Sequence, residues 1–180
     1  ALYQMQFIGP PLTFGFNQLG SACGCIGLNA AVDVGGVSFW MGTDSFFLFD
    51  GAVQKIPCSV QDYVFDDLNV NAKQDIFCAA NTDYNEVMWF YASANSQQID
   101  RVVFYNYAEN LWYVGSLSRT SWADRGTYDN PYAAEFKSTD TTATISTITG
   151  LKAGRTFIHL HETGSNDDGA AMNAHVESGD

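Results

Sequence analysis

The chain has 180 residues, with 8 Lys and Arg side chains against 20 Asp and Glu side chains, and its formal net charge is −12. This excess of acid argues against binding nucleic acid by phosphate neutralisation, which requires clustered cations. The length predicts one domain, or two or three repeats of a larger one. No signal peptide is visible and no stretch approaches the ~20 apolar residues of a spanning helix, so we expect a soluble protein with no membrane partner.

Residues 1–8 alternate in polarity and predict a strand that closes a preceding sheet. The run 12–27 is rich in Gly, Phe and small residues, and it predicts a packed loop without regular structure. Because the chain begins inside this strand-like run, and a new alternation starts around His175 and Val176, we expect both ends to be truncated.

Four short apolar or alternating runs, at 29–34, 37–41, 45–50 and 53–58, predict a first antiparallel sheet. They are separated by Gly35-Gly36, Gly42-Thr43-Asp44 and Asp50-Gly51. Gly-Gly and Asp-Gly supply the positive φ angles of tight hairpins. The aromatic content of these strands requires neighbours on both faces of the sheet. The next segment, 59–75, has apolar residues at near-helical spacing behind Ser59 as an N-cap, and it predicts a short helix or two.

A second set of four runs, at 76–82, 86–93, 101–108 and 111–117, begins 47 residues after the first. Four strands per period of about 40 to 50 residues are the signature of β-propeller blades. We therefore predict an all-β fold, a fragment of a β-propeller with about three blades of up-and-down antiparallel strands, all within one domain. The dense aromatic residues of this second set are expected to be core.

The third set is less regular and spans 131–178, with strands expected at 132–136, 155–162 and 170–177. The segment 137–154 is interpreted as an inserted hairpin or a mobile loop, and 164–169 as a turn. The blade-like sets therefore lie near 29–58, 76–117 and 131–178.

The polar loop 118–131 is the best candidate for surface recognition, because it concentrates charged and aromatic side chains beside a glycine. Its interaction candidates are Arg119, Trp122, Asp124, Arg125 and Tyr128.

The sequence gives little support for a metal-binding or catalytic site. Cys23 and Cys25 with His159, His161 and His175 have the wrong spacing for a zinc site, and the turn 166–168 lacks the ligand set of a calcium loop. The acids and arginines of 118–131 lie on one loop, whereas a propeller active site gathers from several blades. We therefore expect no metal, no cofactor, no catalytic residue and no enzyme activity. The four cysteines, Cys23, Cys25, Cys58 and Cys78, are expected to be reduced thiols.

Four stretches together resemble a family: FFLFDGAVQKIPCSVQDYVFDDLN at 46–69, NEVMWFYASANSQQIDRVVFYNYAENLWYVGSLSRTSWADRG at 85–126, HLHETG at 159–164 and the ending NAHVESGD. The chain resembles the β-propeller hub or nozzle proteins of short-tailed bacteriophages, related to tail tubular and packaged-DNA stabilisation proteins, and the likeness spans nearly all of it. The resemblance implies a non-enzymatic structural protein of the virion tail, assembled in the host cytoplasm. It further implies a homo-oligomeric ring, commonly a hexamer, that contacts portal, adaptor and tail fibres and lets DNA pass without specific binding.

Acid-rich turns, Asp66-Asp67 and Asp167-Asp168, are expected at the ends of sheets. In a nozzle at least one of them would face the DNA path, where repulsion keeps the duplex from the wall; the alternative is an outward, solubilising position. The alternative function is a carbohydrate-binding or host-receptor-binding tail module, followed by a propeller glycoside hydrolase.

Overall fold

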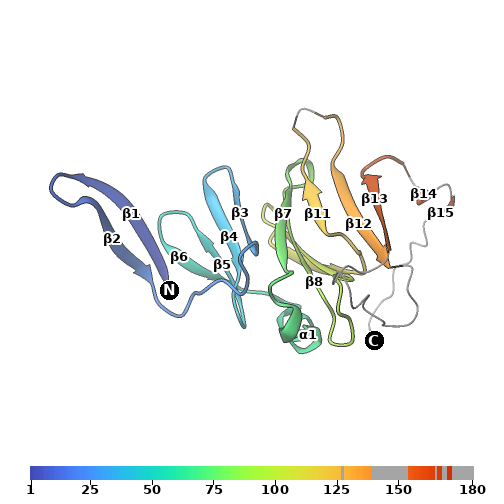
Figure 1. The fold of residues 1–180 in the computed structure, drawn as a ribbon, viewed down its shortest axis with the longest axis horizontal. Helices are drawn as coiled ribbons and strands as arrows, with labels where there is room; N and C mark the ends of the chain where they lie inside the picture. The colour runs from blue at the N-terminus through green and yellow to red at the C-terminus, as the bar shows by residue number, and fades with distance from the viewer. Residues whose placement is uncertain (127, 139–153, 165, 168–169, 172–180) are drawn as a thin grey trace, which may run out of the picture.

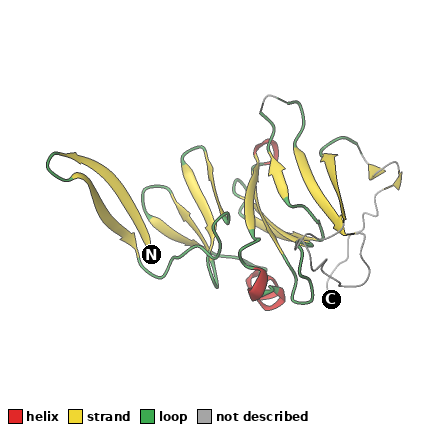
Figure 2. Ribbon diagram, viewed as in Figure 1, coloured by secondary structure: helices red, strands yellow, loops and turns green. Residues whose placement is uncertain are grey.

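A computed structural model describes residues 1–126, 128–138, 154–164, 166–167 and 170–171 (Figure 1). The fold is all-β, built from several antiparallel sheets with a few short helical turns (Figure 2), as the sequence predicts. No helix in the described part of the chain is long and apolar enough to span a membrane.

The chain opens with a hairpin of β1 (Leu2–Gly9) and β2 (Thr13–Gly20), which stands out at one end of the molecule in Figure 1. The expectation of no regular structure over 12–27 is therefore wrong for 13–20. The glycines and aromatic residues of β2 pair with β1. In this stretch, the alternation of Phe with Gly and polar residues therefore indicates a strand. Cross-strand pairing places five apolar side chains on one face, each 47–67% exposed: Tyr3, Met5, Phe7, Phe14 and Phe16.

The first four-stranded sheet has the order β3 (Ala31–Val34), β4 (Val37–Met41), β5 (Phe46–Phe49) and β6 (Val53–Ile56). All its pairings are antiparallel. The predicted up-and-down sheet is confirmed. Gly35 and Gly36 adopt φ of 61° and 87°, the left-handed values that a tight turn between β3 and β4 requires.

Helix α1 (Gln61–Asp67) and the 3₁₀ turn η1 (Val70–Ala72) connect the first sheet to the second. They confirm the predicted helical bridge, but the N-cap position is Val60, not Ser59, and no side chain caps the helix. Burial of Val64 and Leu68 against the sheets holds this helix in place, because a seven-residue helix has little stability of its own.

The second sheet has the order β7 (Phe77–Asn81), β8 (Glu86–Tyr91), β9 (Arg101–Asn106) and β10 (Leu111–Gly115), again entirely antiparallel. The 3₁₀ turn η2 (Thr82–Tyr84) joins β7 to β8, and Asn85 closes it in the left-handed conformation with φ of 57°. The predicted second sheet is confirmed.

The third sheet consists of β11 (Ser121–Ala123), β12 (Tyr132–Ser138) and β13 (Gly154–Leu160). Its first strand lies within 118–131, which the sequence indicates as a loop only. A small hairpin of β14 (Asn166–Asp167) and β15 (Ala170–Ala171) follows. Most of the segment 137–154, and of the strand expected at 170–177, lies outside the described residues.

The first strands of the three larger sheets lie side by side, with β7 between β3 and β11 (Figure 1). Asn29, just before β3, forms a parallel bridge with Phe77. Three contacts along β7 and β11 join residues with the same separation in residue number. Trp122 Nε1 donates to the Ala80 carbonyl, Asp124 binds Thr82, and Arg125 pairs with Asp83. Because residue numbers increase together along the two segments, β11 also runs parallel to β7.

Both faces of the second sheet are buried by its neighbours. Along β8, Val87, Trp89 and Tyr91 pack with Phe39, Met41 and Phe46 of the first sheet. The alternate residues Met88 and Phe90 belong to a second cluster, against which Trp122 of the third sheet packs. A strand buried on both faces reads as a continuous apolar run, which explains the sequence VMWFY.

Candidate binding pocket

A pocket of about 400 Å³ opens where the first strands of the three sheets begin. Asn29 precedes β3, Phe77 is the first residue of β7, and Ser118 and Thr120 precede β11. Because these strands lie side by side and run in the same direction, the segments that lead into them meet at one end of the molecule.

Seven of the ten residues that line this pocket are polar, and one of these is charged. Amides, hydroxyls and a carboxylate come from Asn29, Gln74, Asp75, Gln97, Gln98, Ser118 and Thr120. Apolar surface comes from Phe77, Ile99 and Phe136. The Phe136 ring packs directly against Gly154, where an added Cβ would lie only 2.3 Å from the ring. The pocket therefore combines neutral hydrogen-bonding groups with aromatic walls.

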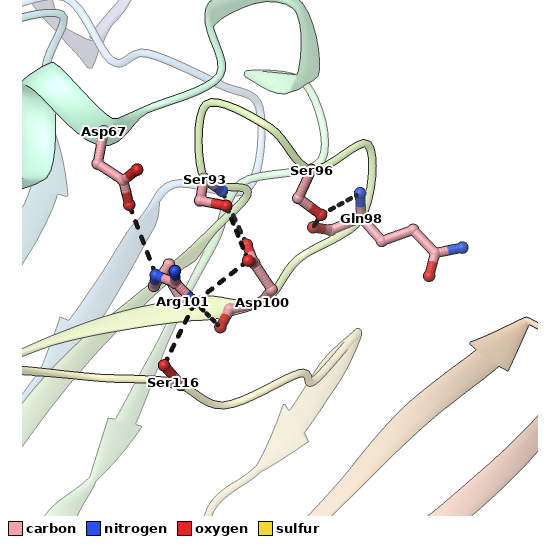
Figure 3. Close-up of polar contacts among 7 residues, drawn as sticks. All are labelled: Asp67, Ser93, Ser96, Gln98, Asp100, Arg101 and Ser116. Atoms are coloured by element: carbon pink, nitrogen blue, oxygen red, sulfur yellow. Dashed lines mark hydrogen bonds and ion pairs between the residues drawn. The ribbon is translucent and has the colours of Figure 1, made fainter.

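The loop between β8 and β9 supplies three lining residues and is tied down at its base (Figure 3). Asp100 accepts hydrogen bonds from the Ser93 backbone N–H and from the Ser93 hydroxyl, both at 2.8 Å. Within the loop, the Ser96 hydroxyl donates to the Gln98 carbonyl at 2.6 Å and accepts from the Gln98 N–H at 3.1 Å. The Gln98 side chain extends away from this network, so the loop presents its amide on a fixed backbone.

The same loop is also tied to the segment that follows α1. The buried Asn69 donates through Nδ2 to the Ser96 carbonyl at 2.7 Å, and its Oδ1 accepts from the Asn71 N–H at 3.0 Å. Asn69 N–H in turn donates to the Ala92 carbonyl at 2.9 Å. Both ends of the Asn69 amide are satisfied, which makes it a rigid link between the two walls of the pocket.

Arg101 connects this region to helix α1 (Figure 3). Its guanidinium lies 3.2 Å from the Asp100 carboxylate and 3.5 Å from the Asp67 carboxylate, and it donates to the Ser116 hydroxyl at 3.3 Å. Burial raises the pKa of the nearby Tyr91 hydroxyl, and the Asp67 carboxylate raises it further. Asp67 is thus part of a structural ion pair.

The five interaction candidates of 118–131 do not form one surface. Arg119 is 8% exposed and pairs with Glu135 at 3.6 Å, while its Nε donates to His161 Nε2 at 3.0 Å. Trp122 packs on Phe90 and donates to the Ala80 carbonyl. Arg119 is paired within the third sheet, and Trp122 joins that sheet to the second, so neither side chain fits surface recognition.

Asp124 and Arg125 also bridge the second and third sheets. Asp124 accepts from the Thr82 hydroxyl at 2.7 Å, and Arg125 pairs with Asp83 at 2.5 Å in a solvent-exposed contact. Tyr128 is 63% exposed and contacts Tyr132 edge-on. Of the described residues in the candidate loop, only Ser118 and Thr120 line the pocket.

Among the described acidic lumen candidates, none lines the pocket. Asp66 is exposed on α1 and Asp67 is paired with Arg101. Asp167 lies in β14, and Asp168 is outside the described residues. The acid that the structure places where the first strands converge is Asp75, which the sequence patterns did not single out.

A buried polar cluster lies on the third sheet. Glu135, 8% exposed, is 2.8 Å from His159 Nε2 and 3.3 Å from Lys137 Nζ, in addition to Arg119. Across strands β12 and β13 these side chains share one face. Among the described residues no group of three His, Cys, Asp or Glu is placed to hold a metal ion.

The four cysteines are unpaired thiols. Cys25 is exposed and donates to the Gly27 carbonyl, whereas Cys23 is buried. Burial raises the pKa of Cys58 to about 11 and raises that of Cys78 well above its ordinary value.

Most pocket residues were missed because they come from four separate polar connections. The one local signal was ANSQQ at 94–98, a run of amides and small residues between two strongly apolar strands. No protein-family model matches this chain, and no curated protein sequence is significantly similar to it.

Proposed function

We propose that this chain is a non-enzymatic structural segment of a β-propeller, and that it serves in a bacteriophage tail as part of a nozzle or hub ring. The observation that carries the propeller proposal is the parallel, side-by-side arrangement of β3, β7 and β11. In such an arrangement the chain completes four antiparallel strands and then crosses back to start the next sheet. The first strands of successive sheets therefore run in the same direction. Radially repeated sheets have this geometry.

The exposed apolar faces support the same proposal. The middle sheet is covered on both faces, whereas the hairpin β1–β2 exposes its aromatic face and β13 exposes Ile158 at 77% and Leu160 at 46%. Apolar patches of this kind mark surfaces that meet another protein surface. The two ends of the row of sheets are therefore where a propeller would continue.

The charge supports a role beside DNA without binding it. A net charge of −12 opposes adhesion of a polyanion. The exposed Asp33, Asp66 and Asp75 contribute negative surface near β3 and α1. The tail assignment itself rests on the sequence resemblance, together with these features.

Two measurements test the proposal. Immunogold labelling of tailed particles assembled from the genome that encodes this chain should mark the tail, at the junction with the capsid. Light scattering of the purified protein should give a closed oligomer, and a DNA filter-binding assay should show no retention. Labelling confined to the capsid, or tight DNA retention, would refute the nozzle role.

A further inference from the structure

We propose that the pocket at the start of β3, β7 and β11 binds a neutral saccharide of one or two rings. This proposal goes beyond the ring role, and it concerns a different surface from the apolar ends of the row of sheets. Its basis is the set of side chains that the fold brings together there.

The hydrogen-bonding groups match sugar hydroxyls. Side-chain amides of Asn29, Gln74, Gln97 and Gln98 each offer donors and an acceptor. The Ser118 hydroxyl can do both, and the Thr120 hydroxyl, which donates to the Ala134 carbonyl, can accept. A sugar hydroxyl likewise donates and accepts, so neutral side chains of this kind can satisfy its hydrogen bonds. Phe77 and Phe136 supply the apolar walls for the C–H faces of a sugar ring.

The charge of the lining selects against acidic ligands. Asp75 is the one charged residue among those that line the pocket. Arg119, although next to Ser118 in sequence, is directed to Glu135 and His161. A phosphate or a carboxylated sugar would therefore meet a negative charge and no lining cation.

A peptide that adds a strand is a poorer match for this wall. The Cys78 N–H donates to the Asn29 carbonyl at 2.7 Å, and the Thr120 N–H donates to the Ala134 carbonyl at 2.8 Å. These backbone groups are already paired, and strand addition needs a free edge. The volume of about 400 Å³ lies near the lower end of the range for small-molecule sites, about 300–1,000 Å³.

The experiment is a titration of the ¹⁵N-labelled chain with N-acetylglucosamine and, separately, with maltose, followed by two-dimensional NMR. The side-chain amide signals of Asn29, Gln97 and Gln98 should shift with a Kd of about 1 mM for at least one of these sugars. The amide signal of Gln6, on the exposed hairpin, should not move. An acidic sugar, N-acetylneuraminic acid, should cause no shift at the same concentration.

Two variants test whether the sugar binds in the pocket. Gln98→Ala should weaken binding about three- to tenfold, the effect of one lost neutral hydrogen bond, while Gln6→Ala should leave the Kd unchanged. Retained dispersion of the backbone signals shows that each variant is folded. The proposal is overturned if neither sugar shifts the pocket amides at about 50 mM, far above a millimolar Kd, or if Gln98→Ala and Gln6→Ala bind equally. Shifts caused by a short neutral peptide but by neither sugar would likewise overturn it.

Discussion

The indole N–H of Trp122, in the third sheet, donates to the backbone carbonyl of Ala80, in the second, at 3.0 Å. Three other tryptophans donate to backbone carbonyls in the same way: Trp40 to Cys23, Trp89 to Ala30 and Trp112 to Pro57. Two of these also join the second sheet to residues that flank the first, because Ala30 directly precedes β3 and Pro57 directly follows β6. The large aromatic residues therefore fix the position of one sheet on the next, in addition to filling the core.

Replacing Trp122 by Phe should destabilise the protein by about 1 to 3 kcal/mol, because the Ala80 carbonyl loses its indole donor and the smaller ring packs less well on Phe90. Urea unfolding followed by circular dichroism measures the change. Tyr128→Phe, at an exposed site, is the control and should unfold like the wild type. Equal stability of Trp122→Phe and the control would contradict a role in joining the sheets.

Asp100→Ala should loosen the loop 94–99 and lower the free energy of unfolding by about 1 to 3 kcal/mol, because Ser93 loses two hydrogen bonds and Arg101 loses an ion pair. Hydrogen exchange should increase at the Ser93 amide and within the loop. Asp44→Ala, on an exposed turn, provides the matched control. Unchanged exchange in this loop would show that Asp100 does not hold it.

Glu86→Gln should stabilise the protein at neutral pH. Burial raises the pKa of the Glu86 carboxyl, and the charge of Glu162 raises it further. A raised pKa in the folded state means that the wild type loses stability as pH rises through that pKa, and Gln does not titrate. The difference in Tm between variant and wild type should therefore grow from pH 4 to pH 7.

The hydroxyl of Tyr113 donates to Glu86 Oε1, and a glutamine oxygen at the same place still accepts this bond. Loss of the bond is therefore not a reason to expect destabilisation. A difference in Tm that is constant with pH, or that is largest at pH 4, would contradict the explanation.

One of the four thiols should react much faster than the others. Cys25 is exposed, Cys23 is buried, and burial raises the pKa of Cys58 to about 11 and that of Cys78 well above its ordinary value. Because the thiolate is the nucleophile, iodoacetamide at pH 8 should label Cys25 first. Mass spectrometry of the digested protein gives the order, and early labelling of Cys78 would contradict the burial.

The two four-stranded sheets could be predicted because their turn residues and apolar runs are local signals. Gly35-Gly36 favours a tight turn wherever the sheet lies, and the short apolar run VMWFY is typical of a strand buried on both faces. Strand β2 was missed because its glycines resemble a loop, although Gly15 lies opposite Gln6 in a regular ladder. The helix was predicted, but its N-cap was not, since packing of Val64 and Leu68 outweighs capping by Ser59.

The pocket could not be predicted because no local signal joins Asn29 to Gln98 or to Thr120. Their proximity follows from the parallel placement of three first strands, which is a property of how sheets pack. Arg119 and Trp122 show the converse, because polar and aromatic residues on an apparent loop were interpreted as a surface. Instead, Arg119 pairs with Glu135 inside the third sheet, and Trp122 binds Ala80 of the second sheet.

Electron cryomicroscopy of the assembled protein tests whether the chain is part of a β-propeller. We expect sheets arranged around one axis, with β3, β7 and β11 innermost and parallel, and with the apolar faces of β1–β2 and β13 covered by further sheets. Sheets stacked as a sandwich with no common axis, or first strands at the outer rim, would contradict it.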